Sequence, residues 1–523
     1  MNHHSLHITR LLLTLFTALS LHASAGTLGS LTYEIVNGTS VTITDCDEAA
    51  TGAIVIPETI ESLPVTSVDG RAFEGCSQIT SISYPSQIQY PPYHYIGCNS
   101  LEAFHVAESN TAITSIDGVL FSADMTKIIR YPNARSTTTD YAIPDGVTSF
   151  YPYTFLECTG LNSVTIPASL SADTGSESVQ QVILSVFKDT SNLQAVHVEE
   201  GNLALSSSNG VVFTQDGSGL LFYPPAKPST SYTVPTGTTY ISFLAFNVCP
   251  IVESIHFPET VTSIADNAFI RCNNLAEFNI HPDNTTFKSI DGVIFSSDLS
   301  ELIIFPQGKT GTYSTPTTIT RIRSRGFSHC TKVTDITLPE DLQIIGASAF
   351  ENCTNLTKAY LLGNAPSFFG ASPFPTNPTI HYLKGATGFD VAPWTDYNLV
   401  EIDTSTYPNA AWLLENQQDH TLSLDEDPNG DGVPLLMEYA LGLKAYQNNA
   451  PNLPQMEIGE TTAGITFQGD TPGINYEVWT STDLSNWTQT GVTLSTPDAN
   501  GKRSATIPHS TSPKAFLQLR VSQ

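Results

Sequence analysis

The segment from Asp427 to Glu438 carries oxygen-bearing side chains at a spacing that can enclose a metal ion. It follows the pattern D-x-N-x-D-G-x5-E, in which alternate residues supply oxygens and Gly432 permits a sharp turn. Calcium takes several such oxygens at about 2.3–2.6 Å, so we predict a Ca²⁺ site, with a solvated acidic turn as the alternative. The predicted ligands are the side chains of Asp427, Asn429, Asp431 and Glu438 and the carbonyl of Val433.

A helix is predicted directly after this loop, because Pro434 suits a first helical turn and apolar residues follow at helical spacing. Its apolar face consists of Leu435, Leu436, Tyr439, Ala440 and Leu443. The segment resembles the EF-hand-like calcium linkers of dockerins and of thrombospondin type 3 repeats in secreted bacterial proteins. A dockerin carries two such loops and this chain has one, so the resemblance implies calcium binding but not cohesin recognition.

Motifs for common catalytic mechanisms are missing from the sequence. Neither HExxH nor GxSxG occurs, and Gly308-Lys309-Thr310 lacks the upstream glycine of a phosphate-binding loop. The sequence does not decide whether two carboxylates lie at the separation found in glycosidases, because it does not place the many acidic residues in space. We predict that the protein is not an enzyme and assign no catalytic residue.

One repeated pattern, F-x-x-C-x-x-L, dominates the rest of the chain. Its eight copies begin at Phe73, Tyr95, Phe155, Phe187, Phe246, Phe269, Phe327 and Phe350. Seven have cysteine at the fourth position, namely Cys76, Cys98, Cys158, Cys249, Cys272, Cys330 and Cys353, and the Phe187 copy has Thr190. A position that accepts either sulfur or threonine behaves as a small buried side chain, so we predict free, buried thiols. Cys46 lies outside the pattern.

Each copy predicts one coil of a stack. The spacing of three favours a tight helical or 3₁₀ turn that faces inward, and the alternation that follows favours a strand. Phe246 and Phe269 are 23 residues apart, within the range of roughly 20–29 typical of leucine-rich repeats. Inserts between coils read as β-hairpins, which either grip a ligand on one face or simply lengthen the coil. These inserts contain Asp117–Phe121, Asn209–Phe213 and Asp291–Phe295, followed by Asp124, Asp216 and Asp298 at a turn.

The repeats Ile264–Cys272 and Ile345–Cys353 share the pattern I-x-x-x-A-F-x-x-C and resemble BspA-type leucine-rich repeats. The DGVLF-type inserts also recur in that family, and the resemblance covers roughly residues 30 to 400. It implies a mainly β fold, a leucine-rich-repeat solenoid with parallel strands, short helical turns and hairpin inserts. It also implies a secreted or surface protein of bacteria with a role in adhesion. No binding residue carries over, because the shared residues are the buried ones.

The charge balance narrows the range of partners. With 50 acidic against 21 basic residues the net charge is -29, which disfavours nucleic acid and anionic lipid. The apolar run from Leu11 to Leu21, followed by Ala23-Ser24-Ala25, predicts a secretory signal peptide. No later run is long enough to span a membrane as a helix. We expect a secreted or cell-surface monomer that binds a protein or a glycan.

Four segments are predicted: a signal peptide (1–25), the repeat solenoid with caps (26–402), a calcium-binding linker (403–450) and a small β-sandwich-like domain (451–523). In the last, Trp479 and Trp487 could stack on sugars, although a strand tryptophan is more often part of a core. Our first hypothesis is an exported, non-catalytic binding or adhesion protein. The alternatives are a carbohydrate-binding accessory protein of polysaccharide utilisation and a structural protein of the cell envelope.

Overall fold

The computed structural model describes residues 25–135, 139–171, 179–368, 373–374, 377–459, 461–508 and 515–523. The chain forms two compact units. The first contains the described residues up to Pro228 together with Leu244–Phe246, and the second contains Ser229–Phe243 and Asn247–Gln523. Apart from Ala25, the predicted signal peptide lies outside the described residues.

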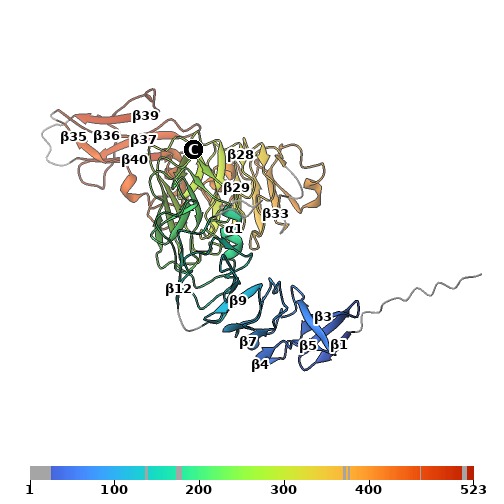
Figure 1. The fold of residues 1–523 in the computed structure, drawn as a ribbon. Helices are drawn as coiled ribbons and strands as arrows, with labels where there is room; N and C mark the ends of the chain where they lie inside the picture. The colour runs from blue at the N-terminus through green and yellow to red at the C-terminus, as the bar shows by residue number, and fades with distance from the viewer. Residues whose placement is uncertain are drawn as a thin grey trace, which may run out of the picture. The chain divides into compact units, whose positions relative to one another are not determined.

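The first unit begins with a hairpin, in which β2 and β3 pair antiparallel around Asn37 and Gly38. Both turn residues have positive φ, 53° and 68°, as a tight hairpin turn requires. A further strand, β1, pairs with β2, and β6 continues the sheet parallel to β3 (Figure 1). The sheet order is β1 (Ala25–Leu28), β2 (Leu31–Val36), β3 (Ser40–Cys46), β6 (Leu63–Val68) and β5 (Thr59–Ile60).

The rest of the first unit alternates parallel sheets with antiparallel inserts. The parallel strands are β4 (Thr51–Val55), β7 (Gln78–Tyr84) and β8 (Ala103–Val106), then β12 (Asp140–Ala142), β14 (Ser163–Ile166) and β15 (Ala195–Val198). The inserts are β9 (Ile113–Ile116), β10 (Val119–Ser122) and β11 (Lys127–Arg130), then β16 (Leu205–Ser208), β17 (Val211–Thr214) and β18 (Gly219–Phe222). β13 (Ser149–Phe150) pairs parallel with β11, and α1 spans Val179–Val186.

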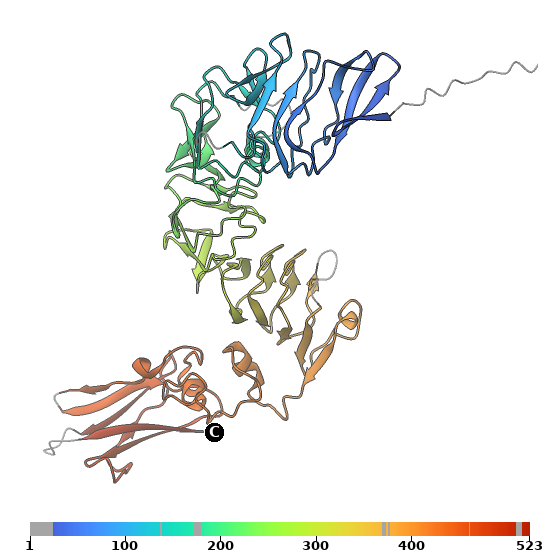
Figure 2. The same cartoon turned by 90° about the horizontal axis from the view of Figure 1, so that it is seen from below.

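The second unit continues this alternation, and its repeat strands lie side by side in Figure 2. One parallel sheet holds β19 (Ser231–Thr233), β21 (Ser254–Phe257) and β23 (Glu277–Ile280). A second holds β27 (Gly311–Ser314), β29 (Val333–Leu338), β31 (Lys358–Leu361), β33 (Thr379–Leu383) and β34 (Leu399–Ile402). The remaining repeat strands are β20 (Tyr240–Ile241), β22 (Ser263–Ile264), β24 (Phe287–Ile290), β25 (Val293–Ser296), β26 (Glu301–Ile304), β28 (Arg321–Ile322), β30 (Ile344–Ile345) and β32 (Ser367–Phe368).

The turn at each F-x-x-C segment differs from the helical turn that the spacing suggests. The backbone does close a three-residue turn, as when the Cys76 N–H donates to the Phe73 carbonyl at 3.3 Å. The residue before the cysteine position, however, has a left-handed backbone in all eight copies, which ends the helical progression after one turn. These residues are Gly75, Gly97, Glu157, Asp189, Val248, Arg271, His329 and Asn352. The coils are therefore joined by consecutive reverse turns rather than by short helices.

The repeat aromatics stack on one another from coil to coil and form the core. The Phe327 ring lies 4.7 Å from Phe305 and 4.9 Å from Phe350 between centroids, nearly parallel to both. Phe155 and Phe187 stack in the same way at 5.4 Å. Because each ring contacts the next coil, burial is shared along the stack, as expected for a solenoid.

The predicted hairpin inserts are confirmed in the structure. β10 and β11 are antiparallel, as are β17 and β18, and β25 and β26. An asparagine anchors each insert to the preceding coil: Asn284 donates to the carbonyls of Pro258 and Val261 and accepts from the Phe287 N–H. Asn110 and Asn202 make the equivalent contacts, which the sequence analysis did not anticipate.

After β34 the chain forms short helices and a second set of strands. The helices after β34 are α2 (Ala410–Glu415), α3 (Leu435–Leu441) and η2 (Ala450–Asn452), and a 3₁₀ turn, η1 (Trp394–Asp396), comes just before β34. The strands are β35 (Met456–Ile458), β36 (Thr462–Gln468), β38 (Thr493–Leu494) and β39 (Lys502–Pro508) in one sheet and β37 (Asn475–Ser481) and β40 (Phe516–Ser522) in another. Side chains of both sheets share a core with Ala440 and Leu441 of α3. Among the described residues, no helix has the length and apolar character needed to cross a membrane.

Candidate functional site

The predicted calcium loop lies between α2 and α3 in the second unit. Asp427 accepts hydrogen bonds from the N–H groups of Gly430 at 3.0 Å and Gly432 at 2.9 Å. Both glycines have left-handed backbones, with φ of 71° and 86°, which agrees with the sharp turn expected at Gly432. Asp431 accepts from the Val433 N–H at 2.8 Å. These hydrogen bonds from nearby backbone N–H groups fix the orientation of the Asp427 and Asp431 carboxylates.

Glu438 closes the loop from the first turn of α3, and its side chain is fully buried. Its Oε1 accepts a hydrogen bond from Asn449 Nδ2 at 2.7 Å, whereas Oε2 has no partner among the described residues. Burial raises the pKa of this carboxyl group, and Asp431 and Asp427 raise it further, while the Asn449 bond acts in the opposite direction. A buried carboxylate oxygen without a donor is costly, and a bound cation would remove that cost.

Two asparagines connect the loop to the chain that follows α3. Asn449, which is almost completely buried, donates its backbone N–H to Asp431 Oδ2 and its side chain to Glu438. Asn429 Nδ2 donates to the carbonyls of Ala445 at 3.0 Å and Gln447 at 2.8 Å. Asn449 was missed by the sequence analysis, because it lies beyond the end of the loop pattern.

The predicted ligand atoms are all oxygens, which are the ligand atoms that Ca²⁺ prefers. Within the described ranges, no three His, Cys, Asp or Glu side chains meet closely enough to hold a metal ion by themselves. A site here would therefore depend on the Asn429 side chain and the Val433 carbonyl in addition to the acids. The Ca²⁺ site stays a prediction.

The cysteines are free and buried, as predicted. Burial raises the pKa of Cys98, Cys158 and Cys353 to about 12 in each case, so these thiols are not poised as nucleophiles. They act as weak donors between coils instead: Cys98 Sγ lies 3.0 Å from the Phe73 carbonyl oxygen, and Cys353 Sγ lies 2.9 Å from that of Phe327. Thr190 also donates to a repeat carbonyl, that of Phe187, at 2.8 Å. Cys46 packs beside this row, and Cys76 Sγ lies 3.4 Å from its carbonyl oxygen.

Trp479 in β37 and Trp487 in the loop that follows it are half-buried rather than central to a core. The guanidinium carbon of Arg520 lies 4.3 Å from the centroid of the Trp479 ring and covers one of its faces. Trp487 donates its indole N–H to the Leu484 carbonyl at 3.2 Å. The expectation that these rings belong to a core is therefore wrong, since the core of these strands is made by other residues, among them Phe467 and Tyr476.

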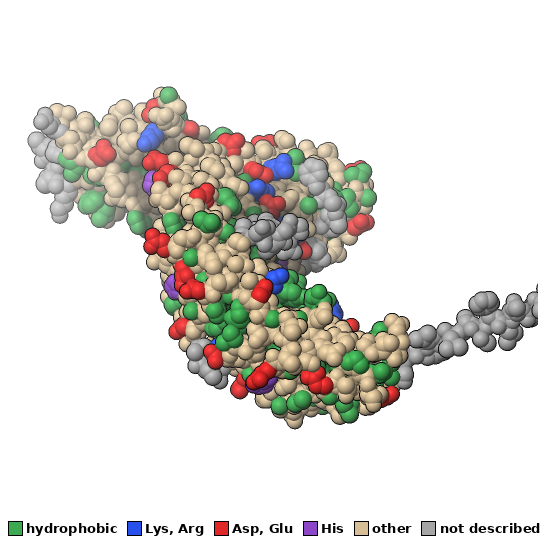
Figure 3. Space-filling view, viewed as in Figure 1, with side chains coloured by type: hydrophobic (Ala, Val, Ile, Leu, Met, Phe, Trp, Pro, Cys, Tyr) green, Lys and Arg blue, Asp and Glu red, His purple; other side chains and the backbone are tan. Residues whose placement is uncertain are grey.

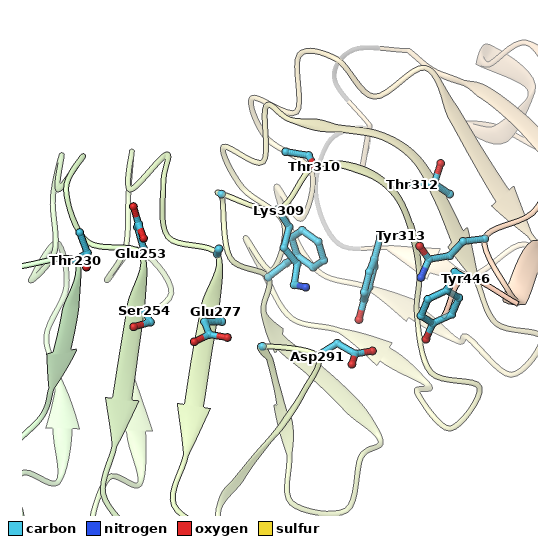
Figure 4. A pocket seen from close by; sticks show the side chains of 15 residues that line it. Thr230, Glu253, Ser254, Glu277, Asp291, Lys309, Thr310, Thr312, Tyr313 and Tyr446 are labelled. Atoms are coloured by element: carbon cyan, nitrogen blue, oxygen red, sulfur yellow. The ribbon is translucent and has the colours of Figure 1, made fainter. Parts of the chain in front are cut away.

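A cavity of about 820 Å³ lies on the second unit, where the repeat strands meet the segment after α2 and α3 (Figure 4). Its wall combines three carboxylates with one ammonium group and aromatic rings: Glu253, Glu277, Asp291, Lys309, Tyr313 and Tyr446. Sequence reasoning missed this site, because Tyr446 lies far along the chain from the repeat residues. The only sequence signal was the insert turn that contains Asp291.

The chain matches the BspA type leucine rich repeat family over residues 53–142, 112–209, 222–315 and 305–374. Solved structures similar to it include a leucine rich cell surface protein of Faecalibacterium prausnitzii, with 20% identity, 66% of this chain and 96% of that chain covered, and a TM-score of 0.38. The pneumococcal vaccine antigen PcpA follows with 16% identity, coverages of 72% and 97%, and a TM-score of 0.34. No curated protein matches the sequence. Because the family match spans more than half of its residues, the chain belongs to the BspA-type leucine-rich repeat family.

Proposed function

We propose that this protein is a non-catalytic binding or adhesion protein that acts on the cell surface or after secretion. The observation that carries this proposal is the difference between buried and exposed repeat positions. Phe73, Cys76 and Ile79 are fully buried, and the corresponding residues of the other coils are buried as well. The repeat residues thus build the solenoid and leave recognition to the side chains between them.

The side chains between the buried repeat positions differ from one coil to the next. The residue that begins the strand before each insert is the half-buried Ala103 in β8, the half-buried Ala195 in β15 and the exposed Glu277 in β23. Acidic side chains are spread over the visible face in Figure 3, and basic ones are few, in line with the net charge of -29. A rigid array that displays different side chains at equivalent points suits the recognition of an extended partner.

We also propose that the loop from Asp427 to Glu438 binds Ca²⁺ with a structural role. The buried, unpartnered Glu438 Oε2 supports this, as do the backbone bonds that hold Asp427 and Asp431. Asn429 and Asn449 hydrogen-bond the loop to the chain between Ala445 and Asn449, so an ion bound in the loop would also stabilise the conformation of that segment.

The proposal is tested by screening the full chain against immobilised extracellular-matrix proteins and glycans, in calcium and in chelator. Binding of a partner that weakens after changes on the repeat array, such as Glu277→Ala, supports recognition by the array. Glycan binding that is insensitive to Glu277→Ala but lost in Trp479→Ala or Trp487→Ala would instead favour the carbohydrate-binding accessory protein. The absence of any discrete ligand would favour a structural envelope protein.

A further inference from the structure

The cavity on the second unit carries an excess of negative charge. Glu253, Glu277 and Asp291 line it together with a single cation, Lys309. Among the described residues none of these four groups forms an ion pair, and neither Glu253 nor Asp291 accepts a side-chain hydrogen bond. Glu277 accepts only from Asn279, at 3.1 Å. The wall therefore offers carboxylates that the chain itself does not neutralise.

Tyr313 places its hydroxyl group at this cavity, and its ring is held in position by packing. Its ring packs against Phe305 with 4.6 Å between centroids, and the side chain is only 8% exposed. Its hydroxyl group has no hydrogen-bond partner among the described residues and points into the cavity toward Asp291 (Figure 4). The ring is thus held in place while its hydroxyl group stays available to hydrogen-bond to a ligand that enters the cavity.

Tyr446 faces Tyr313 from the segment after α3, and Asp291 lies near both rings in Figure 4. Burial raises the pKa of both tyrosines, and the Asp291 carboxylate raises each of them further. Two electron-rich rings beside a carboxylate form a setting that attracts a planar or compact cation, by cation–π contact and by a charged hydrogen bond.

In the first unit, a side chain of the protein itself places a cationic group beside the corresponding tyrosine. Its equivalent cavity, of about 690 Å³, is lined by Asp117 and Arg135. These residues correspond to Asp291 and Lys309, because each aspartate opens a D-G-V-x-F insert and the basic residue follows it by 18 positions. The Arg135 guanidinium carbon lies 5.4 Å from the centroid of the Tyr131 ring and 5.8 Å from that of Tyr141. Arg135 is only 9% exposed and has no acidic partner among the described residues.

The second unit differs at the position of this guanidinium group. Tyr313 occupies the middle of β27, as Tyr141 does in β12, yet within the described residues no cationic group lies over its ring. Lysine replaces arginine at position 309, and the carboxylates outnumber it by three to one. The place taken by a guanidinium in the first cavity is open in the second.

We propose that the cavity lined by Asp291, Tyr313 and Tyr446 binds a guanidinium or ammonium side chain from a basic segment of the protein partner. This inference rests on the proposed binding function and gives the partner a chemical class. Asp291 accepts the charged hydrogen bond, the two tyrosines contact the cation, and Glu253 and Glu277 attract neighbouring basic residues.

The test measures binding of a hexa-arginine peptide to the full chain by calorimetry at low ionic strength, with a hexa-glutamate peptide as the negative probe. Asp291→Asn is expected to weaken hexa-arginine binding about tenfold, the effect of removing one charged hydrogen bond. Asp117→Asn is the matched control, because Asp117 and Asp291 share the same turn and the same φ of 49°. Both substitutions remove one negative charge, so general attraction to an acidic protein affects them equally.

The proposal requires Asp117→Asn to change the affinity less than twofold, and Tyr446→Ala to weaken binding as Asp291→Asn does. Equal losses in the two asparagine variants, or no binding by the unaltered protein, would overturn it. Preferential binding of a neutral oligosaccharide that hexa-arginine does not displace would also overturn it. A partner found by screening that binds Asp291→Asn normally would refute this site while leaving the proposed binding function intact.

Discussion

Asn429 Nδ2 lies 2.8 Å from the carbonyl oxygen of Gln447, so one side chain joins the predicted calcium loop to the segment that carries Tyr446. The same nitrogen donates to the Ala445 carbonyl at 3.0 Å, and Oδ1 accepts from the Asp431 N–H at 3.0 Å. The amide oxygen thus accepts from the loop backbone, while the nitrogen donates to the residues on either side of Tyr446 and lies 3.4 Å from Asp431 Oδ2 and 3.5 Å from Glu438 Oε1. The loop and one wall of the cavity are connected through this residue.

Asn429→Asp is expected to destabilise the protein, although the loop pattern accepts either residue. The aspartate would replace the donor with an oxygen that faces the carbonyls of Ala445 and Gln447. Loss of these bonds at an exposed position should lower the free energy of unfolding by about 1 kcal/mol, as measured by denaturant titration in chelator. A variant as stable as the wild type would show that the two contacts contribute nothing.

Calcium is expected to raise the melting temperature of the full chain, and Glu438→Gln is expected to abolish most of that rise. At a calcium concentration a hundredfold above Kd, binding to the folded state adds about 2.7 kcal/mol. In chelator the glutamine variant should be at least as stable as the wild type, because the amide has no charge to bury.

Glu426→Gln is the matched control for this measurement, since Glu426 is exposed near the loop and lies outside the predicted ligand set. It should keep the full calcium effect. A wild-type melting temperature that is unchanged by calcium would refute the site.

Truncation of one stacked ring should damage the neighbouring coils most. Phe327 is 1% exposed and lies between Phe305 and Phe350, so Phe327→Ala should cost roughly 3–5 kcal/mol. Hydrogen exchange should show lost protection in β26, β29 and β31, with little change in the N-terminal sheet, because contacts in a stack are local. Equal loss of protection throughout the chain would contradict a solenoid in which stability is local.

The native protein should resist thiol reagents. All eight cysteines are buried, and burial raises the pKa of Cys98, Cys158 and Cys353 to about 12, which leaves almost no thiolate at neutral pH. Addition of denaturant should make eight thiols reactive in a colorimetric titration, whereas fewer than eight would reveal disulfides.

Asp298 should give the second unit an acid-sensitive contribution to stability. Hydrogen bonds from Ser296, and from the backbone and side chain of Ser300, lower its pKa to about 2. A pKa lowered by folding stabilises the protein above the unfolded value near 4, and the contribution is lost as the pH falls toward 2. Unfolding of the wild type and of Asp298→Asn, compared at pH 7 and pH 2, should differ at the higher pH and converge at the lower. A difference that is independent of pH would rule out this origin.

The sequence by itself determined the solenoid, because the buried residues that build each coil recur at short, regular spacing. It also located the hairpin inserts, their turns at Asp124, Asp216 and Asp298, and the free thiols, all of which depend on contacts within one module or its neighbour. The left-handed residue before each cysteine was not foreseen, since Glu157, Arg271 and His329 show no glycine signal.

Tertiary structure decided the contacts between segments that are distant in the chain. Tyr446 reaches Asp291 and Tyr313 across more than a hundred residues, and Asn449 meets Glu438 from beyond the loop pattern. A periodic sequence shows which positions keep the same type of side chain in every repeat, and these are the buried positions of the coils. Convergence of non-repeated side chains on one cavity depends on how the chain returns to the array after β34, which no local pattern encodes.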